Sequence, residues 1–161
     1  MNLYLMRHGP ATWPNWHDAD AKRPLTPEGA ALIQAEGRAL AKLDLQPDMI
    51  LHSPLVRARE TATHIAAALN RLDHLHECQP LQPGFDFNRL CYVLKEYAQC
   101  ESLFLVGHLP DMADVVRALI KAEVKFSEGT VAHLKISKPN ESPTGSLLWL
   151  ATAELLTALG Q

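Results

Sequence analysis

Two arginines and two histidines in this sequence could together bind and transfer a phosphoryl group. They are Arg7, His8, Arg57 and His108. A guanidinium group carries a permanent charge and a planar set of donors that matches two phosphoryl oxygens. A neutral imidazole can act as the in-line nucleophile, and a second imidazole can donate to a phosphoryl oxygen or carry the proton. Because the arginines supply the charge, this chemistry requires no metal and no other cofactor.

Three of these residues follow short apolar runs that read as buried strands. Residues 2–6 form one such run, which ends at Arg7 and His8. Residues 102–106 form the clearest buried strand of the chain and lead to His108. A single Arg or His at a strand end is more often a surface residue or a helix cap than a catalytic group. The prediction therefore depends on all four residues together.

Arg57 belongs to the first turn of a helix that follows a third predicted strand, residues 49–52. Ser53 and Pro54 give a cap-then-proline signal, so we expect this helix to begin there and to run to about Asn70. Right-handed crossovers place every strand-to-helix turn of a parallel sheet on one rim. Ligands of open α/β sheets bind at this rim, beyond the carboxyl ends of the strands.

The remaining pattern completes an α/β fold in three layers. Thr26 and Pro27 mark the start of a helix that ends near Lys42. Short strands that alternate with helices predict a mostly parallel sheet of about five or six strands, with helices on both faces. We expect one domain over residues 1–161. The other predicted elements are helices at 86–97, 111–121 and 153–159, a short strand around 76–81, and an antiparallel edge hairpin formed by 130–137 and 146–151.

The segment 10–24 is too rich in proline for a helix and reads as a loop beside the predicted rim. Its residues Trp13 and Trp16 could form one wall of a pocket, or could fix the loop on the core. We expect the polar and charged side chains near this rim to be solvated: His17, Asp18, Asp20, Arg23 and Arg59. The alternatives are that the first three contact the substrate from the loop and that the two arginines help to recruit an acidic partner.

The composition indicates a soluble globular protein of one domain. The chain has 161 residues, 47% hydrophobic and 20% charged, and a net charge of -3. Binding to nucleic acid or to a membrane surface would require a basic excess, so neither is expected. The three cysteines form no closely spaced pair, which favours free thiols in the cytoplasm, and a strand from residue 2 leaves no room for a signal peptide. His74 and His76 have no third metal ligand nearby.

Four sequence elements resemble the signatures of the histidine phosphatase (phosphoglycerate-mutase-like) superfamily. They are Arg-His-Gly at residues 7–9, Leu-Thr-Pro-Glu-Gly at 25–29, the arginine-bearing segment 53–62, and Val-Gly-His at 106–108. Arg-His-Gly alone is a weak signal, but four elements in the family's order are a specific one. The resemblance implies that His8 becomes phosphohistidine and that Arg7, Arg57 and His108 line the phosphate pocket. We also expect Gly9 and Leu109 to contact the substrate.

The sequence departs from the larger members of this family between Arg57 and His108. Mutases and many sugar-phosphate phosphatases carry an insertion there that covers the site and supplies an acidic proton donor. Here the segment is short and is mostly used by two helices. Asp86 is the best candidate acid, although a role as helix N-cap is more probable for it. The missing cap resembles the small bacterial phosphohistidine phosphatases of the SixA type.

The leaving group gives an independent reason to favour phosphohistidine as the substrate. An alkoxide leaving group needs a general acid, and the pKa of water, about 15.7, indicates its basicity. Histidine leaves as a neutral imidazole whose conjugate acid has a pKa of about 6.5. The gap of roughly 9 units corresponds to about 12 kcal/mol in proton affinity. A site with no dedicated acid therefore suits P–N cleavage better than P–O cleavage.

The sequence predicts a phosphatase that forms a covalent phosphohistidine on His8 and acts on a phosphohistidine-bearing protein, such as a phosphotransfer domain of a bacterial relay. Two alternatives remain open: a phosphomonoesterase for a phosphorylated small molecule, and a non-catalytic module that docks a phosphorylated partner. Mutase activity is disfavoured because it needs a cap that keeps the intermediate away from water.

Overall fold

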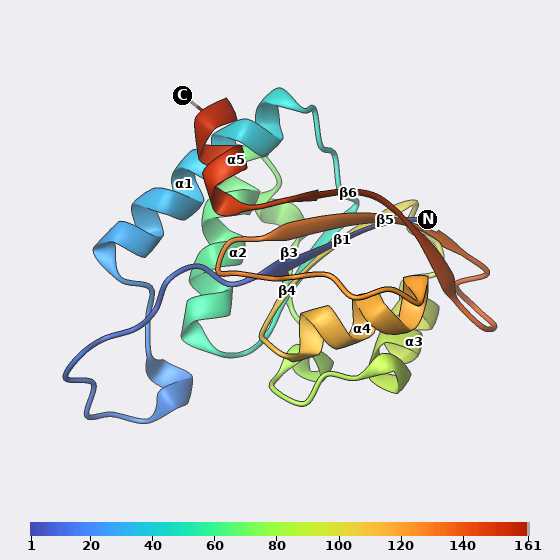
Figure 1. Cartoon of the computed structure of the whole chain (residues 1–161), viewed down its shortest axis with the longest axis horizontal. Coiled ribbons are helices and arrows are strands. Elements are labelled where there is room, and N and C mark those ends of the chain that lie inside the picture. The colour runs from blue at the N-terminus through green and yellow to red at the C-terminus, as the bar shows by residue number, and fades with distance from the viewer. Residues whose placement is uncertain (161) are drawn as a thin grey trace.

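The computed structural model describes residues 1–160 and has a six-stranded mixed sheet as its centre (Figure 1). The strands lie in the order β3-β2-β4-β1-β5-β6. The first four in this order are parallel, and β5 and β6 are antiparallel to their neighbours, which confirms the predicted sheet and edge hairpin. Their bounds are β1 Asn2–Arg7, β2 Met49–His52, β3 Leu75–Glu77, β4 Ser102–Gly107, β5 Val131–Ser137 and β6 Thr144–Ala151.

Five α-helices of the described chain cover both faces of the sheet, so the predicted α/β fold in three layers is confirmed (Figure 1). The helices α3 and α4 lie on one face, and α1, α2 and α5 lie on the other. Their bounds are α1 Pro27–Lys42, α2 Val56–Ala68, α3 Phe87–Glu96, α4 Asp111–Ile120 and α5 Ala153–Leu159.

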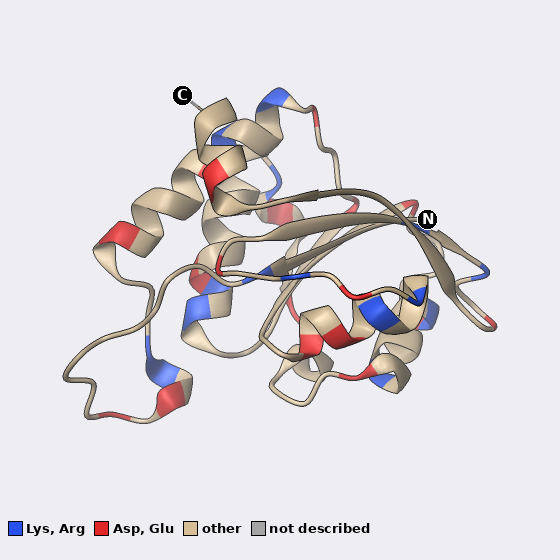
Figure 2. Ribbon diagram, in the orientation of Figure 1, with Lys and Arg blue, Asp and Glu red and all other residues tan. Residues whose placement is uncertain are grey.

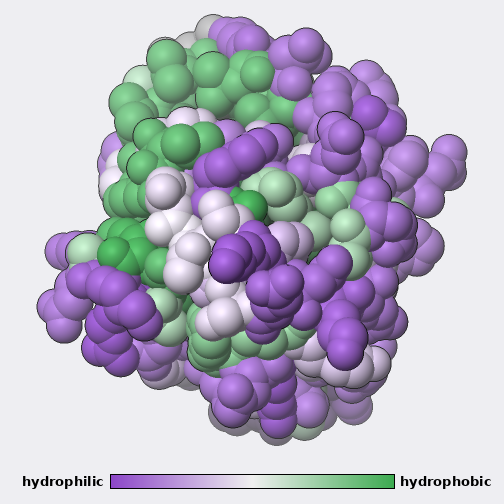
Figure 3. Space-filling view, turned by 90° about the vertical axis from the view of Figure 1, so that its right-hand side faces the viewer, coloured by the Kyte–Doolittle hydropathy of each residue, from purple (hydrophilic) through white to green (hydrophobic). Residues whose placement is uncertain are grey.

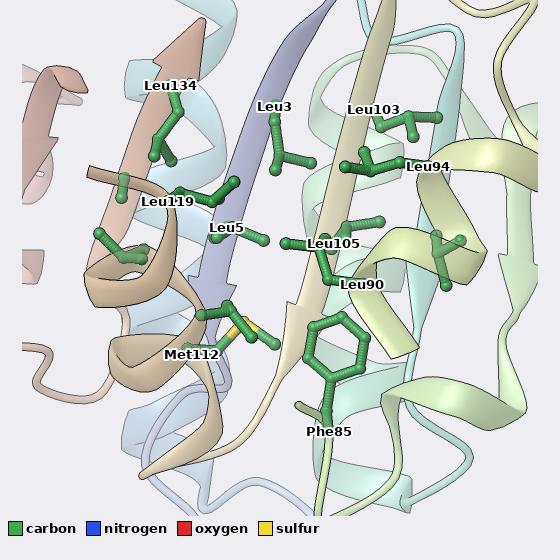
Figure 4. Packing of buried hydrophobic residues seen from close by; sticks show 14 of the residues in the cluster. Leu3, Leu5, Phe85, Leu90, Leu94, Leu103, Leu105, Met112, Leu119 and Leu134 are labelled. Carbon is green, nitrogen blue, oxygen red and sulfur yellow. The ribbon is translucent and has the colours of Figure 1, made fainter. Parts of the chain in front are cut away.

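The central strands are buried on both faces, which explains their nearly continuous apolar sequences. Figure 4 shows Leu3 and Leu5 of β1 beside Leu103 and Leu105 of β4, facing helices α3 and α4. The alternate residues of these strands point to the opposite face and pack in a second cluster with α1 and α2. Two cores thus hold β1 and β4 in place, and the ends of these strands carry the predicted site residues.

Two helix starts confirm the capping signals of the sequence. The hydroxyl of Thr26 accepts a hydrogen bond from the backbone N–H of Gly29 at 3.0 Å, with Pro27 in the first turn of α1. The carboxylate of Asp86 accepts from the N–H of Arg89 at 2.9 Å at the start of α3. Asp86 is therefore an N-cap, as the sequence favours.

Two predictions of element boundaries were wrong. The second helix, α2, does not begin at Ser53-Pro54 but at Val56, and its N-cap Leu55 makes no side-chain cap. The hydroxyl of Ser53 is instead 2.7 Å from Nε2 of His108. The strand expected at 76–81 covers only Leu75–Glu77, because Pro80 has no N–H for a sheet ladder and lies in a short 3-10 turn.

Hydrophobic side chains also reach the surface near the C-terminus of the described chain. Leu148 of β6 and Leu155 of α5 are each about half exposed. In Figure 3 hydrophobic residues gather at the upper left of the viewed face, whereas hydrophilic residues cover most of its right side.

Within residues 1–160, no helix is both long enough and apolar enough to cross a lipid bilayer.

Candidate active site

The imidazole of His8 lies directly after β1 and is held in one tautomer. Its Nδ1 is 2.7 Å from the backbone carbonyl oxygen of Gly9, which can only accept a hydrogen bond. Nδ1 therefore carries the proton, and Nε2 of the neutral ring carries the lone pair. The Nε–H of Arg57 donates to this Nε2 at 3.3 Å. His8 is thus oriented with its unprotonated nitrogen beside a cation.

The surroundings of His8 keep its ring neutral. Burial lowers its pKa to about 4, although the hydrogen bond to Gly9 acts in the opposite direction. The charges of Arg57, Arg7 and Arg23 contribute to this lowering. At neutral pH the ring is therefore unprotonated at Nε2, which is the form that a nucleophile requires.

The second histidine, His108, follows β4, the parallel neighbour of β1. The ring centroids of His8 and His108 are 5.2 Å apart. Nε2 of His108 is 2.7 Å from the hydroxyl oxygen of Ser53, which also accepts from the N–H of Leu55 at 3.3 Å. The pKa of His108 is lowered to about 3, mainly by burial, with smaller contributions from the neighbouring His8 and Arg57. Its buried Nδ1 has no hydrogen-bond partner within the described residues.

Arg57 is almost fully buried and brings its guanidinium group to the same place from the first turn of α2. Its Nη1 donates to the backbone oxygen of Asp20 at 2.9 Å, and its Nη2 donates to the Asp20 carboxylate at 3.0 Å. Arg23 donates to the other oxygen of this carboxylate from Nε and Nη2, at 3.0 and 2.8 Å. Asp20 thus bridges two arginines that a phosphoryl group would also attract.

Asp20 and Arg23 both contribute to the candidate site, which for Asp20 agrees with the alternative of a substrate contact, although its side chain is 62% exposed. Both lie in the loop between β1 and α1, whose short helical turn carries neighbouring acidic and basic residues (Figure 2). Two hydrogen bonds hold the pair in the site: Arg57 donates to the carboxylate of Asp20, and Arg23 donates to the backbone oxygen of Ala11. The only sequence signal was the spacing of three between an acid and a base in an otherwise irregular loop.

Arg7 ends β1, and its guanidinium group is 3.7 Å from the carboxylate of Glu128 in the loop before β5. The backbone N–H of Gly129 donates to the carbonyl oxygens of Arg7 and His8, at 3.2 and 3.4 Å. The segment before β5 therefore hydrogen-bonds to the end of β1 and places the carboxylate of Glu128 at the rim of the site. Sequence patterns gave no indication of Glu128.

One cavity of about 370 Å³ contains the side chains described above. Leu109 lines it, whereas Gly9 does not: the N–H of Gly9 donates to the hydroxyl of Thr61 at 3.1 Å. Asp86 is also outside the lining. No group of three metal-ligating side chains occurs in the described part of the chain. The residues that line the cavity are Arg7, His8, Thr12, Asp20, Arg23, Arg57, Pro83, His108, Leu109 and Glu128.

This arrangement agrees with what comparison with known proteins finds. A family model described as histidine phosphatase superfamily (branch 1) matches residues 3–80, which include His8 and Arg57. The chain belongs to this superfamily. Among curated proteins, an uncharacterized protein of Picosynechococcus sp. is 36% identical over 140 residues, which cover 86% of this chain and 81% of the relative. Phosphohistidine phosphatase SixA of Escherichia coli is 25% identical over 92% of both chains.

Solved structures match over nearly the whole chain. The protein histidine phosphatase SixA in complex with tungstate has a TM-score of 0.84 at 23% identity, covering 95% of this chain and 97% of that one. A mycobacterial glucosyl-3-phosphoglycerate phosphatase in complex with VO3 has a TM-score of 0.74 at 18% identity, covering 94% and 99%. The fold of this superfamily member is therefore SixA-like, and the superfamily supports phosphatase chemistry through phosphohistidine.

Proposed function

We propose that this superfamily member is a phosphatase that uses His8 as its nucleophile and removes phosphoryl groups from phosphohistidine on a partner protein. The observation that carries the proposal is the state of Nε2 of His8. This atom is unprotonated, buried in a cationic pocket and within 3.3 Å of the Arg57 guanidinium group. A nucleophile and a donor for the transferred oxygens are therefore already adjacent.

The reaction would proceed in two displacements. In the first, the lone pair on Nε2 of His8 forms a bond to phosphorus while the bond from phosphorus to the partner's imidazole nitrogen breaks. The departing electron pair stays on that imidazole, which leaves as neutral histidine when it is protonated before departure. In the second, a water oxygen bonds to phosphorus, the P–N bond to His8 breaks, and the water gives up a proton. The products are histidine and inorganic phosphate.

The cations of the pocket suit the charge of the transferred group. Arg57 and Arg7 would bind the equatorial oxygens, and Nδ1 of His108, buried without a partner, could donate to one of them when protonated. Tungstate, which the related SixA structure contains, is a tetrahedral oxyanion of the same kind as phosphate. These points support a pocket built for a phosphoryl group.

The carboxyl groups in and near the pocket are engaged elsewhere, which favours P–N over P–O cleavage. Glu128 of the cavity lining is 3.7 Å from the guanidinium group of Arg7. Asp20 is slightly desolvated, which raises its pKa, but the hydrogen bonds from Arg23 and the charge of Arg57 outweigh this effect and lower the pKa. Asp20 is therefore ionised at neutral pH and has no proton for an alkoxide. Asp86 is used as a helix cap. A leaving imidazole needs no such donor, which supports phosphohistidine as the substrate.

A phosphomonoesterase for small molecules is the second candidate. Its support is the presence of Asp20 in the cavity lining, together with the structural likeness to a glucosyl-3-phosphoglycerate phosphatase. In that case Asp20 would have to take up a proton before each turnover.

A location in the cytoplasm, where phosphotransfer proteins and free thiols occur together, is part of our proposal and agrees with the three free cysteines.

The first experiment compares kcat/KM on a phosphotransfer domain phosphorylated on histidine with kcat/KM on a panel of phosphomonoesters. His8→Ala should abolish turnover of both substrates and leave the affinity for inorganic phosphate largely intact. The matched control is His17→Ala, since His17 is exposed in the loop and outside the cavity. Unchanged turnover in His8→Ala would refute the mechanism. A preference for one small ester would transfer the assignment to the second candidate.

A further inference from the structure

A second cavity, of about 570 Å³, lies beside the candidate active site and has a mostly apolar lining. The indole of Trp13 forms one side of it and is 36% exposed. The first turn of α1 and the middle of α2 form the other sides. We call this cavity the Trp13 groove; its apolar lining residues are Trp13, Pro24, Leu25, Pro27 and Ala30.

A single loop separates the Trp13 groove from the catalytic cavity. Thr12 and Arg23 line the catalytic cavity, and their chain neighbours Trp13 and Pro24 line the groove. The indole N–H of Trp13 donates to the carbonyl oxygen of Pro24 at 2.9 Å, so the two segments of the loop are tied together. The wall between the two cavities is therefore one pair of chain segments thick.

We propose that the Trp13 groove is the docking site for apolar side chains that flank the phosphohistidine on the partner protein. This inference rests on the proposed function and adds to it the surface by which a protein substrate is recognised. Small phosphate esters end at the catalytic cavity and have no contact with the groove.

The geometry of a histidine side chain explains why this occupant fits. Only one methylene group joins an imidazole to its backbone, so a phosphohistidine that reaches Nε2 of His8 brings its own protein surface against the rim. The loop that forms the wall is part of this rim, and the groove lies on the other side of the loop. The groove is thus next to the rim that a protein substrate has to contact.

The composition of the groove is that of a protein-binding site. Tryptophan anchors in apolar pockets with a polar border are typical hot spots of interfaces. The carboxylate of Glu60 is already engaged by the backbone N–H of Leu25 at 2.8 Å, so it does not demand a cation from the partner. Thr63 and His64 supply the polar border on α2. An apolar segment can enter while Glu60 keeps its hydrogen bond from Leu25 and the Thr63 hydroxyl keeps its hydrogen bond to the carbonyl oxygen of Arg59.

The test measures kcat/KM for a bacterial phosphotransfer domain phosphorylated on histidine and for p-nitrophenyl phosphate, in wild type and in three variants. Trp13→Ala removes the anchor, and Ala30→Arg fills the groove from α1 and leaves the sequence of the loop unchanged. Trp16→Ala is the matched control. Trp16 belongs to the same loop, but it does not line the groove, and its indole N–H donates a hydrogen bond to the carbonyl oxygen of Ala19. The readout is the ratio of the two kcat/KM values.

Both groove variants should lower this ratio about tenfold or more through a higher KM for the phosphotransfer domain, and Trp16→Ala should not. The docking proposal is overturned if the ratio in Trp13→Ala and Ala30→Arg equals that of wild type, or if both substrates are affected equally. Failure of the proposed function is a separate result: the wild-type protein itself would then not dephosphorylate the phosphotransfer domain.

Discussion

The buried carboxyl group of Glu36 should make this protein measurably less stable as the pH rises. Glu36 lies on the inner face of α1 and is fully buried, and neither carboxyl oxygen has a hydrogen-bond partner in the described residues. The pKa of this group is raised to about 8, mainly by burial and to a smaller extent by the charge of Glu154. Glu36 is therefore neutral in the folded protein under most conditions.

The sign and size of the effect follow from the pKa values of the two states. The ordinary pKa of 4.5 applies to the unfolded chain, and the folded value is higher, so folding binds a proton between these values. Below pH 4.5 the group costs nothing through ionisation, and the cost grows until the pH passes the folded pKa. From 1.36 kcal/mol per unit, the cost is about 1 kcal/mol at pH 5 and about 3 kcal/mol at pH 7.

The variant Glu36→Gln keeps the shape of the side chain and cannot ionise. Its free energy of unfolding in urea should therefore exceed that of the wild type by about 2 kcal/mol more at pH 7 than at pH 5. The buried histidines titrate equally in both proteins and cancel in this difference. Glu141→Gln, in the exposed turn before β6, is the control and should show no such pH dependence. A difference between wild type and Glu36→Gln that is equal at both pH values would refute the reasoning.

Two further predictions concern the catalytic cavity. Asp20→Asn frees the guanidinium groups of Arg57 and Arg23 from an anion, so inorganic phosphate should inhibit the variant at a concentration a few times lower, the modest effect expected of a largely exposed carboxylate. Unchanged or weaker inhibition would contradict the view that Asp20 competes with the phosphoryl group. Ser53→Ala removes the hydroxyl beside Nε2 of His108 and should lower kcat about tenfold with little change in KM. A loss confined to KM would instead mean that Ser53 helps to bind substrate.

Most of the fold and the core of the site could be predicted from local patterns. Strands that end in Arg7-His8 and in His108 are continuous apolar runs, and the caps Thr26 and Asp86 act on backbone groups three residues away. Such signals lie within one helix or strand and do not depend on contacts with distant segments. The convergence of the four site residues then follows from the parallel order of the strands.

The residues that sequence analysis missed depend on contacts between distant segments. Ser53 has the pattern of a helix cap, but its hydroxyl is used by His108, which is 55 positions away. Asp20 meets Arg57 across 37 positions, from a loop without periodicity. Glu36 was within reach of sequence reasoning, since it stands three residues after the buried Ile33 and four before the buried Leu40.

The division of labour within the site suggests where substrate preference resides. Arg7, His8 and His108 are fixed by two buried strands, so the chemistry of phosphoryl transfer depends on the rigid part of the fold. The loop between β1 and α1 supplies two further contacts: Asp20 as a competing anion, and Trp13 as one side of the adjoining groove. A change in this loop can therefore alter which phosphorylated partner is accepted while the strands keep the nucleophile and its cations in place.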